Sequence, residues 1–256
     1  MKSQSNQSTK ATKMVKKIGL IGCGAIGTVL AEAIERKLVI CDELVVFDAD
    51  AAKAQKLKAS LTFPVKIANS VDQLLAAKPK VVVEAAGQQA VRDYFDKLVA
   101  SNAEIIIMST GALLSLNVDD PKIHFPAGAI GGLDAIAAAA NAAITEVTLT
   151  SRKNPKALNK TNTEETIVYE GTAKEAARLF PREMNVAATL ALTVKPVQVK
   201  VKVVSDPKVT RNTHEINVKW RYGEMQLRFA NDPHPDNPHT SALAAWAAIQ
   251  LLKTLL

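Results

Sequence analysis

The sequence predicts an α/β fold in two parts: a doubly wound parallel sheet, then an α+β region with a mainly antiparallel sheet. Up to about residue 126, short runs such as Val81–Val83 are almost wholly apolar and alternate with helical patterns. Parallel strands covered on both faces have this character. After Glu146, apolar residues recur at every second position, as in residues 197–203. This period indicates antiparallel strands with one covered face.

The first element is a short apolar strand, residues 18–21, which runs directly into glycine. Residues 22–27, Gly-Cys-Gly-Ala-Ile-Gly, fit the pattern G-x-G-x-x-G. In that pattern Gly22 allows a sharp turn, Gly24 lets the backbone approach a pyrophosphate, and Gly27 lets the next helix pack close to the strand. The alternative is a plain glycine turn, because the pattern by itself is weakly specific.

A helix and a second strand follow this motif in the order of a dinucleotide-binding βαβ unit. The helix begins at Ala25 and Ile26, whose amides point toward the phosphate position. The second strand ends at Asp48, 21 positions after Gly27, where a carboxylate can bind both ribose hydroxyls of NAD. We therefore predict a Rossmann fold that binds NAD or NADP. Asp48 favours NAD because its charge repels a 2′-phosphate; a Rossmann-like fold without nucleotide is the alternative.

Further strands are expected at 65–68, 81–84 and 104–108, with helices at 51–63, 70–77 and 90–100. Ligands of such sheets bind beyond the carboxyl ends of the strands. Ala86 and Gly87 follow one strand and residues 109–112 follow another. We expect these segments to line the cofactor site together with the glycine motif.

Charge and composition restrict the function. Of the net charge of +7, residues 1–17 carry five lysines and no acid, leaving 27 basic and 25 acidic residues elsewhere. We interpret residues 1–16 as a disordered, solvated tail, and predict no nucleic-acid partner. No apolar stretch is long enough to cross a membrane, and two cysteines form no disulfide framework. The expected location is cytoplasmic.

The second part begins with a glycine hinge after Pro126 and an Ala-rich helix at about 132–143, in which Asp134 faces solvent or caps a turn. A capping box at residues 172–175 opens a helix that ends at Pro181. A proline-rich loop at 231–238 leads into a final apolar helix at 242–256. That helix is expected to return to the first part or to fill a subunit interface.

Three polar features of the second part could carry chemistry. His214 shares a strand face with Ile216 and Val218, so it is either a general base or a satisfied core histidine. Asn185 either caps its helix or binds nicotinamide or substrate. Residues 152–153, Arg-Lys, are either a solvated pair or the cations that a dicarboxylate requires. No histidine or cysteine spacing indicates a metal site.

Several blocks of the chain resemble the L-aspartate dehydrogenase family. They cover nearly everything from Lys17 onward and read GCGAIG, STGAL, PAGAIGGLDAI, LTSRKNPKAL, YEGTAKEAARLFPREMNVAATLAL, THEI and NPHTS. Departures are FPREMNV, where a second Asn or Lys is expected before Asn185, and the N-terminal extension.

The resemblance implies NAD(P)-dependent conversion of L-aspartate to oxaloacetate and ammonia through iminoaspartate, which can feed NAD synthesis. It also implies an architecture similar to homoserine dehydrogenase and dihydrodipicolinate reductase, and a homodimer. The family's catalytic histidine corresponds to His214, and its nicotinamide contacts to Ala129 and Asn185. Residues 17–126 with 238–256 would form the dinucleotide-binding domain, and 127–237 the substrate domain. A homoserine dehydrogenase, an imine reductase and a non-catalytic NAD sensor remain alternatives.

Overall fold

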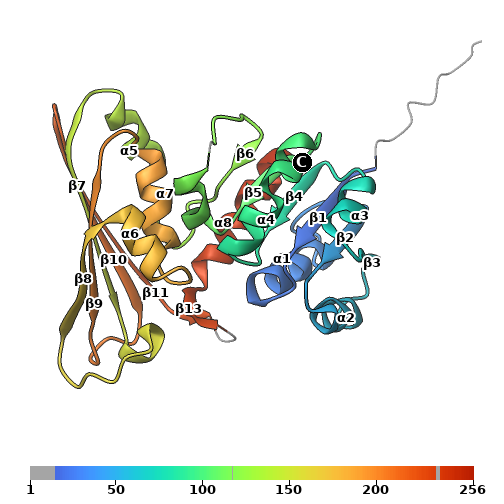
Figure 1. Cartoon of the computed structure of the whole chain (residues 1–256), viewed down its shortest axis with the longest axis horizontal. Helices are drawn as coiled ribbons and strands as arrows, with labels where there is room; N and C mark the ends of the chain where they lie inside the picture. Colours follow the sequence, from blue (N-terminus) through green and yellow to red (C-terminus); the bar gives the residue numbers. More distant parts are fainter. Residues whose placement is uncertain (1–14, 117, 235–236) are drawn as a thin grey trace, which may run out of the picture.

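The computed structural model describes residues 15–116, 118–234 and 237–256 (Figure 1). Most of the tail predicted at residues 1–16 lies outside the described residues. The five-stranded sheet occupies one end of the molecule and the six-stranded sheet lies toward the other, with helix α7 (Asn185–Thr193) between them. The fold class predicted from sequence is confirmed.

The six-stranded sheet is parallel throughout, in the order β3-β2-β1-β4-β5-β6. Its elements alternate strand and helix: β1 Lys17–Ile21, α1 Ala25–Glu35, β2 Glu43–Phe47, α2 Ala51–Ala59, β3 Val65–Ile67, α3 Val71–Ala76, β4 Val81–Glu84, α4 Gln88–Ala100, β5 Glu104–Ile107, the 3-10 helix η1 Thr110–Ser115, and β6 Ile123–His124. The central strands have almost no exposed residues because helices cover both faces.

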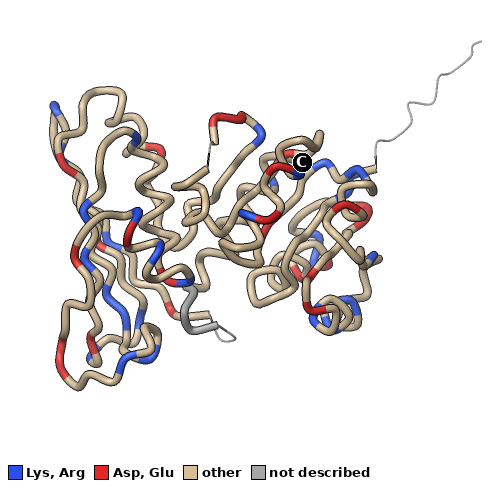
Figure 2. The backbone as a smooth tube through the Cα atoms, viewed as in Figure 1, with Lys and Arg blue, Asp and Glu red and all other residues tan. Residues whose placement is uncertain are grey.

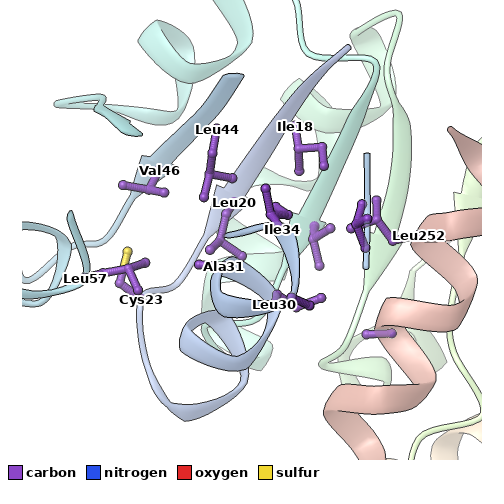
Figure 3. Packing of buried hydrophobic residues seen from close by; sticks show 14 of the residues in the cluster. Ile18, Leu20, Cys23, Leu30, Ala31, Ile34, Leu44, Val46, Leu57 and Leu252 are labelled. Atoms are coloured by element: carbon purple, nitrogen blue, oxygen red, sulfur yellow. The ribbon is translucent and has the colours of Figure 1, made fainter. Parts of the chain in front are cut away.

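One face of this sheet packs against α1 and against the last helix of the chain, α8 (Leu243–Leu255). Figure 3 shows Leu20 and Leu44 of the strands on the same side of the sheet as Leu30 of α1, with Leu252 of α8 at the edge of the cluster. The opposite face buries α3 and α4 in a second cluster. The last helix therefore returns to the first part of the chain, one of the two predicted places. Trp246 nevertheless remains half exposed on its outer side.

The five-stranded sheet has the order β11-β10-β7-β9-β8. Its strands are β7 Ile144–Lys153, β8 Thr166–Thr172, β9 Val199–Ser205, β10 Asn212–Trp220 and β11 Gly223–Asn231. Only β7 and β9 pair in parallel, so the mainly antiparallel prediction is confirmed. One face is covered by α5 (Leu133–Ala140), α6 (Ala173–Leu179) and α7.

The other face of the five-stranded sheet carries charges of both signs (Figure 2). Glu146 pairs with Lys200 and Lys219, and Glu170 pairs with Lys202. The alternation of strand side chains thus separates an apolar inner face from a solvated outer one. Among the described residues, no helix is both long and apolar enough to span a bilayer.

Three details differ from the sequence prediction. The Ala-rich helix is shorter than predicted because Gly132 caps it in the left-handed conformation (φ +71°) and Ala143 leaves the helix with φ +64°. Residues of the predicted proline-rich loop pair as β12 (Pro233–His234) and β13 (Asn237–Ser241). Short 3-10 turns, η1 and η2 (Pro155–Leu158), were not predicted.

The two sheets are joined by polar contacts as well as by apolar packing. Thr110 of η1 donates from its hydroxyl to the carbonyl oxygen of Asn185 at 2.8 Å and contacts the hydroxyl of Thr189 at 3.0 Å. Gln88 of α4 donates to the carbonyl oxygens of Ala177 and Pro181. These hydrogen bonds dock α6, α7 and the connection between them on the carboxyl edge of the parallel sheet, where a ligand is expected.

Candidate active site

The three glycines of the motif have different surroundings. Gly22 adopts φ +98°, and a Cβ there would lie 2.6 Å from the backbone of Ala85 and Ala86. A Cβ on Gly27 would overlap the carbonyl oxygen of Gly22. A Cβ on Gly24 would meet nothing within 4 Å. Two glycines therefore permit close packing, and the third leaves open the position where a pyrophosphate would lie.

The N-terminus of α1 and Asp48 complete this part of the site. Ala25 and Ile26 form the first turn of α1, whose leading amides have no partner within the helix. The Asp48 carboxylate accepts from the backbone N–H of Cys23 at 2.7 Å and of Asp50 at 2.9 Å. These bonds fix the carboxylate beside the glycine loop. Burial, reinforced by the charge of Asp48, raises the pKa of the Cys23 thiol to about 12, so it stays protonated.

A groove runs along the carboxyl edge of the parallel sheet from Asp48 past Gly24 to Ala86. It lies at the edge of the sheet where the sequence predicts the cofactor site. Tyr94 and Lys53 also line it. Gly87, the other residue expected here, directly follows Ala86 and is the N-cap of α4, where a Cβ would also meet nothing within 4 Å. The groove, the open Gly24 and the carboxylate of Asp48 fit a dinucleotide in chemistry and in space.

Glu84, at the carboxyl end of β4, organises the two loops behind this groove. Its buried carboxylate accepts from the N–H groups of Ala86 and Gly87, both at 2.8 Å, and from the N–H and hydroxyl of Ser109. Burial raises the pKa of Glu84, while these hydrogen bonds act in the opposite direction. The carboxylate thus holds the β4 and β5 loops in one arrangement.

A second cavity lies where the two sheets meet, and we call it the inner pocket. Its lining combines Ile26 of α1 with residues of the hinge, of β7, of β10 and of α7. The polar and hinge residues in it are Gly128, Ala129, Lys153, Arg182, Glu183, Asn185, Thr189, His214 and Ser241. Three residues singled out from sequence, Ala129, Asn185 and His214, therefore meet in one cavity that also touches the first turn of α1.

His214 is buried, with 1% of its surface exposed. It lies opposite Ser151 in the β7–β10 register, and its Nδ1 is 2.9 Å from the Ser151 hydroxyl. Burial, with the positive charge of Lys153 adding to it, lowers the pKa of His214 to about 3. The ring is therefore neutral near pH 7, and with Nδ1 engaged by Ser151, Nε2 is the atom left to exchange a proton with a ligand.

Lys153 corrects one of the two interpretations of residues 152–153. Arg152 points outward and pairs with Asp206 at 3.0 Å and Glu165 at 2.6 Å. Lys153 points inward, is 2% exposed and lines the inner pocket. The solvated-pair interpretation is therefore wrong for Lys153, because the strand alternation that buries Val147 also buries this residue.

Asn185 and Ala129 are held by contacts across the sheets. Met184, not Asn185, is the N-cap residue of α7, so the capping interpretation of Asn185 is wrong. Instead its Oδ1 accepts from the N–H of Gly111 at 3.1 Å. The NH₂ group of Asn185 is then left to donate hydrogen bonds to a ligand. The carbonyl oxygen of Ala129 accepts from the Asn231 amide at 2.8 Å, which fixes the hinge against β11.

Comparisons with known proteins match both parts of the chain to dehydrogenases. The family profile described as "Aspartate dehydrogenase, C-terminal" matches residues 134–255, and "Homoserine dehydrogenase, NAD binding domain" matches residues 22–123. The L-aspartate dehydrogenase of Methanosarcina barkeri is 35% identical over 93% of this chain and 96% of its own. That of Archaeoglobus fulgidus is 37% identical over 92% and 96%. The chain belongs to the L-aspartate dehydrogenase family.

Solved structures support this family assignment. Aspartate dehydrogenase from Thermotoga maritima has a TM-score of 0.73 and 26% identity, covering 94% of this chain and 97% of that one. A myo-inositol dehydrogenase from Lactobacillus casei, in complex with NAD(H) and myo-inositol, has a TM-score of 0.55 at 15% identity, a likeness of fold alone. The two-sheet architecture is therefore shared beyond the L-aspartate dehydrogenase family.

Several residues of the site were not identified from the sequence. Ser151, Arg182, Glu183 and Ser241 lie within the blocks that carry the resemblance but were assigned no role, and Glu84 was taken only as the end of an apolar strand. The period-two pattern of residues 147–153 is a further signal, since it places Ser151 and Lys153 on the covered face. Within the described part of the chain, no group of three His, Cys, Asp or Glu side chains could hold a metal ion.

Proposed function

We propose that this protein is an NAD-dependent L-aspartate dehydrogenase that interconverts L-aspartate with oxaloacetate and ammonia through iminoaspartate. One observation carries the proposal. A neutral, buried histidine and a buried lysine share a cavity with the first turn of the glycine-motif helix. Such a cavity can place an amino acid between a proton acceptor and a bound dinucleotide. Membership of the L-aspartate dehydrogenase family supports this substrate.

The cofactor would lie along the groove, with its pyrophosphate over Gly24 and the amides of Ala25 and Ile26. Asp48 would accept hydrogen bonds from the ribose hydroxyls. Its charge would disfavour a 2′-phosphate, so NAD would be preferred to NADP. Ala86 and Gly87 would flank the groove, and Ala129 and Asn185 would contact the nicotinamide end in the inner pocket. When bound, the nicotinamide supplies the hydride acceptor. The protein's contribution is to orient C2 of aspartate against it.

His214 would act as general base. Hydrolysis of iminoaspartate requires water to add to the imine carbon, and a neutral imidazole can take the proton that this water loses. Ser151 on Nδ1 keeps the ring oriented with Nε2 toward the cavity. In the reverse direction the same nitrogen would return a proton as water leaves.

The division into domains is part of the proposal. Residues 17–126 with 238–256 form the dinucleotide-binding domain, and 127–237 form the substrate domain. The active enzyme is a cytoplasmic homodimer, and its product iminoaspartate can supply NAD synthesis. Half-exposed Trp246 and the exposed side chain of Ile40 are apolar surface that an oligomer could cover.

The test is an assay of the purified protein with oxaloacetate, ammonia and NADH, repeated with NADPH, and in reverse with L-aspartate and NAD. Oxidation of NADH that depends on both oxaloacetate and ammonia is the expected result. Faster turnover of homoserine than of aspartate indicates a homoserine dehydrogenase, and reduction of unrelated imines an imine reductase. NADH binding without turnover of any of these substrates indicates a cofactor-sensing protein.

A further inference from the structure

We infer that Lys153 binds a carboxylate of the substrate directly, and that it is the residue which selects acidic amino acids. The inference rests on the proposed function for the substrate class. The first observation that supports the inference is the position of Lys153. Lys153 ends β7 on the face that holds Ser151, one strand from His214, and all but 2% of its surface is buried. The lysine therefore lies beside the proposed base, inside the cavity.

The charges around the inner pocket explain what such a lysine can do. Among the described residues that line it, Lys153 and Arg182 are the cations, and Arg182 is exposed while Lys153 is not. Glu183, from the connection before α7, is half-buried and attracts Lys153. L-Aspartate brings two carboxylates into this cavity, and a desolvated ammonium is a strong partner for a carboxylate.

The free-energy cost of burying Lys153 also favours binding of a substrate carboxylate. Burial lowers the pKa of this lysine to about 8, although Glu183 acts in the opposite direction. A buried charge of this kind is destabilising unless it is compensated. A substrate carboxylate would supply further compensation only in the complex, so part of the cost of burial is recovered when the correct ligand arrives.

The neighbouring histidine gives the lysine a second effect. The charge of Lys153 helps to lower the pKa of His214. A carboxylate placed on Lys153 would offset that charge and raise the pKa of His214 toward the range in which a base is efficient. Burial is the larger cause of the low pKa of His214, so binding of an acidic substrate would make the ring more basic without fully restoring its ordinary pKa.

The experiment measures binding of succinate, a dicarboxylate without an amino group, to the enzyme–NADH complex by titration calorimetry. Lys153→Met should raise the dissociation constant about tenfold to a hundredfold, the usual weight of a hydrogen bond to a charged group. Lys156→Met, at an exposed lysine three residues on, should leave it unchanged. Normal succinate binding by Lys153→Met, or failure of succinate to bind the wild-type complex, contradicts the inference.

A pH series separates ligand binding from structural support and does not depend on the methionine variant being folded. In the wild type, succinate should bind progressively more weakly above pH 8, because Lys153 loses its proton there. The other titratable or charged groups that line the pocket with this lysine are His214, Glu183 and Arg182. Of these, His214 is already neutral throughout that range. Lys153→Arg keeps a cation that does not titrate below pH 10, so its succinate binding should be level from pH 7 to about 9.5.

An identical pH dependence in the wild type and Lys153→Arg contradicts the inference. The succinate titrations need no turnover, so they are independent of the proposed reaction. Wild-type protein that binds succinate through Lys153 but does not oxidise aspartate overturns the proposed function alone. Aspartate oxidation with succinate binding indifferent to Lys153 overturns this inference alone.

Discussion

At the scale of single residues, environment distinguishes two acidic side chains, Asp48 in the groove and Glu84 buried behind it. Glu84 is enclosed by four hydrogen bonds and holds loops, whereas Asp48 accepts two backbone N–H groups and still lines the groove. Asp48 therefore remains available to a ribose, and Glu84 does not.

Replacing Asp48 by serine should narrow or reverse the preference for NAD over NADP. The negative charge that repels a 2′-phosphate is then gone, while a hydroxyl can still reach a ribose oxygen. The measurement is the ratio of kcat/KM for the two cofactors. Asp96→Ser, at an exposed position on α4, is the matched control and should leave the ratio unchanged. An unchanged ratio in Asp48→Ser would remove Asp48 from the cofactor site.

The lowered pKa of His214 has a consequence for the pH profile. Burial keeps the ring in its neutral, proton-accepting form from neutral pH down toward about 3. A histidine with the ordinary pKa of about 6.5 would instead lose activity as the pH falls through that value. We therefore expect kcat/KM for aspartate, which reports groups of the free enzyme, to show no loss centred at pH 6.5. An acid limb centred at or above about pH 6.5 contradicts this assignment.

At the scale of elements, the glycine loop offers a matched pair of substitutions. Gly24→Val should fold normally and lose NADH binding, because its Cβ has open space and its backbone (φ −82°) suits any residue. Gly27→Val should lower the melting temperature instead, because its Cβ would overlap the Gly22 carbonyl. Calorimetric melting and NADH titration of both proteins test the contrast. Normal NADH affinity in folded Gly24→Val would refute this placement of the pyrophosphate.

Most elements could be predicted because their signals are local. The glycine motif, the apolar runs of the parallel strands and the capping box, in which Thr172 accepts from the N–H of Glu175, all lie within short windows. The same holds for the covered face that carries His214, since strand alternation defines it. Fold class and one candidate for catalysis therefore followed from sequence patterns.

The rest of the site depends on contacts between distant segments. Asn185 is oriented by Gly111, 74 positions earlier, and no local pattern contains that bond. Lys153 has a strand pattern that places it inward, yet a charged residue at a strand end is usually solvated. Lys153 lies on the face of the sheet that α6 and α7 cover. The sequence offered two interpretations of each of these residues, and the packing of the two sheets was needed to choose between them.

At the scale of the whole molecule, the two sheets contribute different parts of the proposed active site. The parallel sheet supplies the groove, and the five-stranded sheet supplies His214 and Lys153. Thr110 and Gln88 fix the parallel sheet to the segments around α7 through buried hydrogen bonds. Cofactor binding and proton transfer should therefore be separable by mutation, although the chemistry requires both sheets.

The most direct test of this account is the His214→Asn protein, measured for both turnover and NADH binding. A residue that cannot exchange a proton should lower kcat by about 10²–10⁴-fold, while NADH binds near normally. His124→Asn is the control, since His124 lies on β6 and contacts Glu104 at 2.6 Å. Retention of more than about a tenth of the wild-type kcat by His214→Asn would contradict its role as the base.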